Sequence, residues 1–307
     1  MTAFDPSLAP AEPAPPPVET PLRRFLLDFA ESHIAMAGLV VFAIILLVAV
    51  FAPLVSPQNP YDLATLDLLD GRLPPGEHAA NGTIYWLGTD DQGRDMLSAI
   101  FYGLRTSLGV GASSAVLALI IGGTLGLLAA YVGGRLETLI MRIVDIQLSF
   151  PSILVALILV AMLGQGVGKI IIALVTVQWA YYARTVRSSA LVERRKEYIE
   201  AARCLALGNA RIVFRHLMPN CLPPLIVVVT VQVAHAIALE ATLSFLGIGL
   251  PITEPSLGLL IANGFQYLMS GKYWISFFPG VALLITIVSI NLVGDQLRDV
   301  LNPRLRR

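Results

Sequence analysis

The sequence predicts an all-α membrane protein with six transmembrane helices. Hydrophobic residues make up 56% of the 307 residues, charged residues make up only 14%, and the mean hydropathy is +0.73. A soluble fold of this length would not bury so much apolar surface. The chain also contains six mostly apolar windows, each close to the roughly 20 residues needed to cross about 30 Å of hydrocarbon.

The six windows are separated by polar or charged stretches. The predicted spans are residues 34–55, 107–131, 146–163, 167–183, 222–247 and 274–293. The third span begins beside the polar Arg142, Asp145 and Gln147 and contains Pro151. The fourth span is short and includes Gln178.

The spans divide the chain into five segments. They are a Pro/Ala-rich tail with a juxtamembrane segment (1–32), a first transmembrane helix (33–55), an extracytoplasmic segment (56–104), a five-helix transmembrane domain with a cytoplasmic loop at 190–218 (105–298), and a C-terminal cytoplasmic tail (299–307). Repeated prolines among alanines predict that the first twenty residues are disordered. The run at Ile34 begins too late and is too long for a signal peptide, so we expect it to remain as a membrane helix.

The distribution of basic residues predicts the orientation. With the N-terminus in the cytoplasm, all but five of the 21 Lys and Arg residues fall on the cytoplasmic side; the five are Arg72, Arg94, Arg105, Lys169 and Lys272. An excess of cytoplasmic Lys and Arg is what usually sets topology. Both termini are therefore predicted to be cytoplasmic.

A charged segment between the fourth and fifth spans predicts a helix outside the bilayer. Ile199, Ala202 and Leu205 recur at helical spacing on one stripe. Glu200 is spaced for ion pairs with Lys196 and Arg203 on another face.

A second, shorter helix is predicted directly after the first. We expect Gly208 to end the first helix with a positive φ and Asn209 to cap the second. The second helix should end near Met218, because Pro219 follows.

Four polar residues inside the spans are candidates to line a translocation path, because polar groups in a membrane are expensive: Gln178, Gln232, His235 and Glu240. The alternative for Glu240, which we favour, is a buried hydrogen bond to a neighbouring helix or a position near the outer interface. For the two glutamines, the favoured alternative to a place in the path is interhelical hydrogen bonding. A single histidine without a second ligand makes no metal site, so none is predicted.

Small residues in the second span predict close helix packing. Gly109 with Ser113, and Gly122 with Gly126, are four residues apart on one helical face, which lets two backbones approach in lipid. Packing within the chain is the favoured interpretation. A seam with a second subunit is the alternative.

Residues 88–95, Gly-Thr-Asp-Asp-Gln-Gly-Arg-Asp, precede the second span. They lack the lysine and the preceding strand of a nucleotide-binding loop, so nucleotide binding by this chain is not expected. We expect Asp90 or Asp91 to cap the outer start of the second helix. The spans contain no HExxH or GxSxG motif and no paired aspartates, so an intramembrane enzyme is disfavoured.

The cytoplasmic loop resembles the EAA loop of prokaryotic ABC importer permeases, most closely those of the dipeptide and oligopeptide (DppC/OppC-type) family. The residues that carry the resemblance are Glu200-Ala201-Ala202, Gly208, Ile212 and Leu217-Met218-Pro219. Residues 88–95, 243–247 and 291–299 look like further signatures of that family in its usual order. The resemblance covers nearly everything from Arg23 onward and departs from the family at Asn302 and in residues 69–81.

This resemblance implies a type I ABC importer (MetI-like) permease core with an additional N-terminal helix. It implies that the loop is a coupling helix that docks on a cytoplasmic ATPase. The residues that would couple the two proteins are Glu200, Ala201, Ala202, Gly208, Ile212, His216 and Pro219. In this role Glu200 supplies charge, Ala201 and Ala202 allow close approach, and Gly208 sets the bend.

The resemblance also implies a set of partners in a bacterial cytoplasmic (inner) membrane. They are a second homologous permease, two ABC ATPases that bind ATP and Mg²⁺, an extracytoplasmic substrate-binding protein and membrane lipid, with no nucleic acid and no cofactor in this chain. Peptides are the expected substrate, with glutathione or nickel as alternatives. An ATP-independent secondary transporter or channel is the alternative of another class. It would require a pseudo-symmetric repeat, which the six spans do not show.

Overall fold

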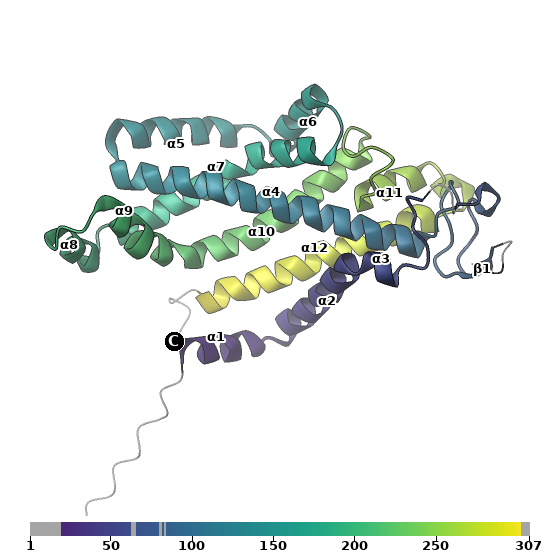
Figure 1. Cartoon of the computed structure of the whole chain (residues 1–307), viewed down its shortest axis with the longest axis horizontal. Helices are drawn as coiled ribbons and strands as arrows, with labels where there is room; N and C mark the ends of the chain where they lie inside the picture. Colours follow the sequence, from purple (N-terminus) through teal and green to yellow (C-terminus); the bar gives the residue numbers. More distant parts are fainter. Residues whose placement is uncertain (1–19, 63–65, 80–81, 83, 302–307) are drawn as a thin grey trace, which may run out of the picture.

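Long helices lie side by side in a bundle, and a small two-stranded hairpin lies at one end (Figure 1). The computed structural model describes residues 20–62, 66–79, 82 and 84–301. The Pro/Ala-rich tail before residue 20 and the departure at Asn302 lie outside the described residues. The predicted all-α architecture is confirmed.

The elements follow one another with short connections. The α-helices are α1 (Pro21–Ala30), α2 (His33–Val50), α3 (Ala52–Val55), α4 (Met96–Val132), α5 (Gly134–Ser149), α6 (Ser152–Leu163), α7 (Val167–Glu193), α8 (Glu197–Cys204), α9 (Asn209–Arg211), α10 (Met218–Phe245), α11 (Leu257–Phe265) and α12 (Trp274–Leu301). A π-helical segment, η3 (Ile212–Leu217), joins α9 to α10, and two 3₁₀ turns are η2 (Leu68–Asp70) and η4 (Leu268–Ser270). Strands β1 (Glu77–His78) and β2 (Ile84–Tyr85) pair antiparallel, with Glu77 opposite Tyr85.

Four helices in the described part of the chain are long and apolar enough to cross a membrane: α2, α4, α12 and the continuous run Asn209–Phe245. Helices α5 and α6 add a fifth crossing if they are taken as one span, but they are bent by 92° at the break between them. The prediction of one helix over residues 146–163 was therefore wrong. The reason is Pro151, which keeps Phe150 extended (φ −96°, ψ 142°) and so stops α5.

The remaining predicted spans are helical but have different ends, and α7, which contains the predicted span 167–183, is not among the candidate membrane spans of the described chain. Helix α7 continues to Glu193, ten residues past its predicted end at 183, and α12 continues to Leu301. Helix α4 begins at Met96, so the expected boundary at residues 104–105 lies inside a helix. Helices α4 and α12 both extend past the apolar window, because polar and charged turns at their ends can remain helical outside the hydrocarbon.

Helices α4 and α7 make the most extensive contact in the bundle. A Cβ placed on Gly122 would lie 2.1 Å from the Trp179 carbonyl oxygen, and one on Gly126 would lie 2.4 Å from that of Ala183. The two backbones therefore touch, and the favoured interpretation of this glycine pair as internal packing is confirmed. A Cβ on Gly109 would meet nothing within 4 Å, and Ser113 is exposed, so that second pair lies on the outer surface.

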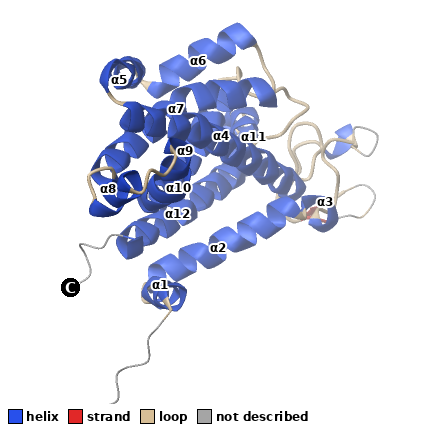
Figure 2. Cartoon of the chain, turned by 60° about the vertical axis from the view of Figure 1, so that its left-hand side comes forward, coloured by secondary structure: helices blue, strands red, loops and turns tan. Residues whose placement is uncertain are grey.

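Helices α1 and α2 lie at the edge of the bundle, beside α12 (Figure 2). Gly38 of α2 faces Leu292 of α12, where an added Cβ would come within 2.9 Å of the Leu292 Cβ. The Gln296 side-chain amide donates to the Asp28 carbonyl at 3.1 Å, which fixes α1 to the end of α12. Helix α8, helix α1 and the end of α12 lie at one end of the bundle, and the hairpin and α11 lie at the other (Figure 1).

We expect Gly126→Val to lower the free energy of unfolding by about 1–3 kcal/mol, because the new side chain meets a backbone carbonyl that cannot move aside. Gly123→Val is the matched control: it adds the same β-branched residue three positions away, where an added Cβ meets nothing within 4 Å. The thermal unfolding midpoints of the two purified variants measure the effect. Equal midpoints would contradict the backbone contact.

Candidate functional site

Helix α8 stands outside the long helices but is held by a buried face. Ile199 and Ala202 are 1% and 4% exposed and pack with Ile212, Leu217 and Tyr182. The predicted stripe is therefore correct for its first two members. Leu205 is 74% exposed, contrary to the prediction, because the helix has ended before it and the chain has turned.

A Schellman motif ends α8, and it lies two residues earlier than predicted. The Leu207 N–H donates to the Ala202 carbonyl at 3.2 Å and the Ala206 N–H donates to the Arg203 carbonyl at 2.9 Å. The residue with positive φ is Ala206 (52°). Gly208 has φ −60° and ψ 145°, which any residue adopts, so the prediction of a positive φ there was wrong. A Cβ on Gly208 would also meet nothing within 4 Å.

The coupling candidates divide between the surface and the interior. Glu200, Ala201, Gly208 and Pro219 are exposed, His216 is half-buried, and Ala202 and Ile212 are buried. The exposed members lie near two large apolar side chains that are also exposed, Leu205 and Phe214 at 62%.

A network around Glu193 fixes the start of α8. Lys196 pairs with one carboxylate oxygen of Glu193 at 2.6 Å, and the Tyr198 hydroxyl donates to the other at 2.7 Å. Lys196 thus binds Glu193 rather than Glu200, contrary to the predicted pair. Burial, with the hydrogen bond to Glu193, raises the pKa of Tyr198, so the phenol stays protonated and donates.

Two hydrogen bonds attach the exposed loop to the end of α4. The Tyr131 hydroxyl donates to the Asn209 side-chain oxygen at 2.7 Å, and an Arg194 Nη1 donates to the Ala130 carbonyl at 2.7 Å. The last carbonyls of a helix favour a cation, so Arg194 also complements the α4 terminus. Asn209 does not use its side chain to cap α9. No sequence pattern announces these contacts, because their partners are 78 and 64 residues apart.

The second helix does not end at Pro219, as was predicted, but continues into α10. Residues 212–217 form a π-helical segment in which each turn is wider than in an α-helix. Pro219 then lies in the first turn of α10, where a missing N–H costs least. The Asn220 side-chain amide donates to the His216 carbonyl at 2.6 Å. The loop and the membrane helix are thus one continuous element, Asn209–Phe245.

The four path candidates come from two helices, Gln178 from α7 and the other three from α10. The Gln178 amide donates to the Gln232 carbonyl at 3.1 Å, and both glutamines are buried. Glu240 is fully buried and accepts from the Ser107 hydroxyl at 2.8 Å and the Ser244 hydroxyl at 2.7 Å. The hydrogen bond from Ser107 of α4 is interhelical, as in the interpretation that we favoured for Glu240. His235 is half-buried, with no hydrogen-bond partner for Nδ1 within the described chain.

An apolar hollow of about 500 Å³ lies next to the loop, between α4, α7 and α10. Leu119, Leu127, Val186, Met218 and Leu225 are among its lining residues. Across the residues that the structure describes, no three His, Cys, Asp or Glu side chains are grouped to hold a metal ion.

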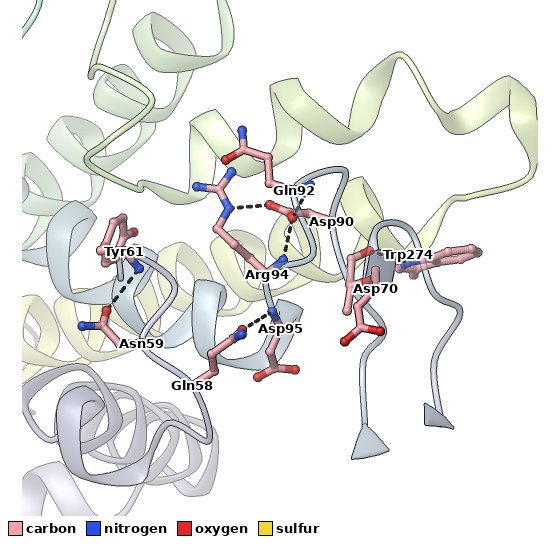
Figure 3. Close-up of polar contacts among 10 residues, drawn as sticks. Gln58, Asn59, Tyr61, Asp70, Asp90, Gln92, Arg94, Asp95 and Trp274 are labelled. Atoms are coloured by element: carbon pink, nitrogen blue, oxygen red, sulfur yellow. Dashed lines mark hydrogen bonds and ion pairs between the residues drawn. The ribbon is translucent and has the colours of Figure 1, made fainter. Parts of the chain in front are cut away.

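At the other end of the bundle, Asp90 organises residues 88–95 (Figure 3). One Asp90 carboxylate oxygen accepts from the backbone N–H groups of Gln92 and Arg94, both at 2.9 Å. The other pairs with Arg94 Nε at 2.7 Å. Asp90 therefore satisfies loop amides, but α4 is capped by Asp95, which accepts from the Ser98 N–H at 2.9 Å.

Glycines let this outer loop pack closely. Gly88 has φ +78°, and a Cβ there would lie 2.5 Å from the Leu73 carbonyl oxygen. The Trp274 indole donates to the Thr89 carbonyl at 3.1 Å, which fixes the loop to the start of α12. The Tyr85 hydroxyl donates to Asp70 at 3.1 Å; burial, with this bond, raises the pKa of Tyr85 to about 12.

Comparisons with known proteins match this architecture. Residues 122–307 match the model of the binding-protein-dependent transport system inner membrane component family, and residues 20–75 match the N-terminal transmembrane domain of oligopeptide transport permease C. The chain is 37% identical over 306 residues to the dipeptide transport system permease protein DppC of Alkalihalophilus pseudofirmus (98% of this chain, 97% of the relative). It is 42% identical over 294 residues to DppC of Escherichia coli (96% of each).

Two further similarities extend this result. The oligopeptide transport system permease protein OppC of Bacillus subtilis is 38% identical over 282 residues (92% of this chain, 89% of the relative). A chain of the inward-facing MetNI methionine ABC transporter superposes with a TM-score of 0.56 at 22% identity, covering 67% of this chain and 98% of that one. The latter shows a shared fold, and it confirms the expected MetI-like core.

We expect Glu240→Leu to lower the free energy of unfolding by about 1–3 kcal/mol, because two buried serine hydroxyls lose their acceptor. Glu240→Gln keeps one side-chain oxygen and should have a smaller effect. Thermal unfolding of the purified variants gives the order. A Leu variant as stable as the Gln variant would show that the serine hydrogen bonds do not stabilise the bundle.

Proposed function

The chain belongs to the family of binding-protein-dependent transport system inner membrane components, and from this premise we propose that it is the permease subunit of an ABC importer that brings peptides into the cell. Three relatives named as dipeptide or oligopeptide permeases align over 89% or more of their own length, which supports a peptide substrate. Glutathione and nickel are the alternative substrates, so an uptake assay must compare them with peptides.

The exposed loop at α8 is the proposed contact with a cytoplasmic ATPase. Gly208 carries this proposal, because neither its backbone angles nor the space around it within the chain requires a glycine. A missing side chain at such a position suits the close approach of another protein. The neighbouring Glu200 offers a charge and Leu205 offers apolar area, a combination common where protein partners meet.

The rest of the assembly follows from the same proposal. Two ATPase subunits would bind ATP and Mg²⁺ and hydrolyse the nucleotide, and a second homologous permease would complete the path. The open surface at Gly109 and Ser113 of α4 is suited to a close seam with that second permease. Lipid would cover the remaining apolar faces, which include the exposed Val40 and Ile44 of α2.

The two ends of the bundle are assigned by charge. Helix α8 and the described ends of the chain would lie in the cytoplasm of a bacterial cell, in agreement with the excess of basic residues there. The opposite end, with the outer loop around Asp90 and helix α11, would face an extracytoplasmic substrate-binding protein. Solute specificity would then reside mainly in that protein.

We expect Gly208→Trp to leave membrane insertion and thermal stability unchanged but to abolish co-purification of the ATPases and peptide uptake. The indole would project from an exposed site and prevent docking. Gly208→Ala is the matched control and should retain most uptake. Glu200→Lys should weaken the same contact by reversing a charge.

Affinity purification of the tagged chain, followed by mass spectrometry and an uptake assay with a labelled dipeptide, tests the proposal. Full uptake by the Trp variant would remove the docking assignment. A chain that purifies alone and transports solute in liposomes without ATP would instead indicate a secondary transporter or channel.

A further inference from the structure

Helices α5 and α7 share an exposed polar strip that the proposed coupling does not use. On each helix three polar residues recur at positions i, i+3 and i+7, which places them on one face. All six are exposed: Arg142, Asp145, Ser149, Tyr181, Arg184 and Ser188. We call them the α5–α7 polar strip.

An ion pair between Asp145 and Arg184 joins the two halves of the strip. It remains open to the surroundings, because 59% of the Asp145 side chain and 50% of the Arg184 side chain are exposed. The serine hydroxyls bond only to carbonyls of their own helices, Ser149 to Asp145 and Ser188 to Arg184. The strip therefore keeps unused hydrogen-bonding capacity on the surface of this chain.

The strip lies at the depth where two predicted spans reach their inner edge, and lipid is a poor neighbour there. The predicted third span begins at residue 146, next to Asp145, and the predicted fourth span ends at residue 183, next to Arg184. A long arginine can extend its head group to an interface, but Asp145 is too short to do so. Charged groups at such depths normally face water or other protein groups.

Water is a better neighbour for the strip than another protein surface is. A dry contact with a second subunit would have to satisfy the open ion pair and also Arg142, which has no ion-pair partner among the described residues. Burying such charges without complete pairing is destabilising. Gln178, Gln232 and Glu240, by contrast, are buried within the bundle and do not reach this face.

We propose that the α5–α7 polar strip is the water-facing wall of the inner part of the transport path, and that it offers its two charges to the termini of a passing peptide. The inference rests on the proposed function for its substrate. A free peptide carries an ammonium and a carboxylate, which match Asp145 and Arg184. An exposed ion pair is only weakly stabilising, so it can exchange partners without retaining the solute.

Thiol accessibility in the complete transporter tests the strip. Ser149→Cys and Ser188→Cys change one atom each, and Ile44→Cys on the apolar edge helix α2 is the control facing lipid. A charged, membrane-impermeant methanethiosulfonate is applied at the cytoplasmic face, and labelling is followed at each cysteine by mass spectrometry. Mass spectrometry also distinguishes the introduced cysteines from the native Cys204 and Cys221.

Both strip cysteines should react about tenfold or more faster than the one at position 44, since the reagent attacks a hydrated thiolate. A saturating concentration of dipeptide, present during ATP turnover, should lower the labelling rate of the strip cysteines by about half, because the peptide would shield them from the reagent. Strip cysteines as slow as the control, or cross-linked to a second permease, would overturn the strip as a water-facing wall. If dipeptide does not change the labelling rate, the proposed contact with substrate is overturned.

The outcomes separate this inference from the proposed function. If the strip cysteines are labelled fast but the unaltered transporter takes up no peptide, the peptide assignment is wrong and the water-facing wall stands. If they are labelled slowly in a transporter that does take up peptide, the wall is wrong and the proposed function stands.

Discussion

The backbone contact between α4 and α7 is the constraint on which the rest of the structure depends. Glycines at 122 and 126 bring the carbonyls of Trp179 and Ala183 within the distance that a Cβ would occupy, so no larger residue is compatible with this approach. The contact fixes where the two helix ends next to α8 meet. It therefore places the α4 terminus where Arg194 and the exposed loop can bind it. Association of this kind is needed in lipid, where apolar surface alone does not drive helices together.

The loop is consequently a rigid extension of the bundle. Its buried face packs against Tyr182, its start is held by Glu193, and Asn209 is bound by Tyr131 of α4. Its far end continues through the π-helical segment into α10 without a break. A displacement of α8 by a partner would therefore move α4, α7 and α10 together. A flexible connector would absorb the same displacement, so these contacts are what the proposed coupling would require.

Periodicity and apolar length predicted what depends on local sequence: the four long apolar spans, the helix at α8 and the burial of Ile199 and Ala202. The pattern misplaced the turn, because a glycine is the usual residue of positive φ and here Ala206 takes that conformation in a Schellman motif. The rule that proline ends a helix failed at Pro219 because the preceding wide turns accommodate it. It held at Pro151, where the chain bends. The bonds to α4 join distant residues and have no local signature. The roles of the site residues remain predictions.

The chain treats its polar groups in and beside the predicted spans in two different ways, and the difference has a physical consequence. Glu240 is enclosed by serine hydroxyls from its own helix and from α4, so its cost is met within one chain. Asp145 and Arg184 are paired but left open on the surface. Lipid cannot solvate such a pair, and the described chain supplies nothing that covers it. The isolated chain is thus an incomplete solvation unit. The pair therefore needs water beside it, which in the proposed assembly is the water of the transport path.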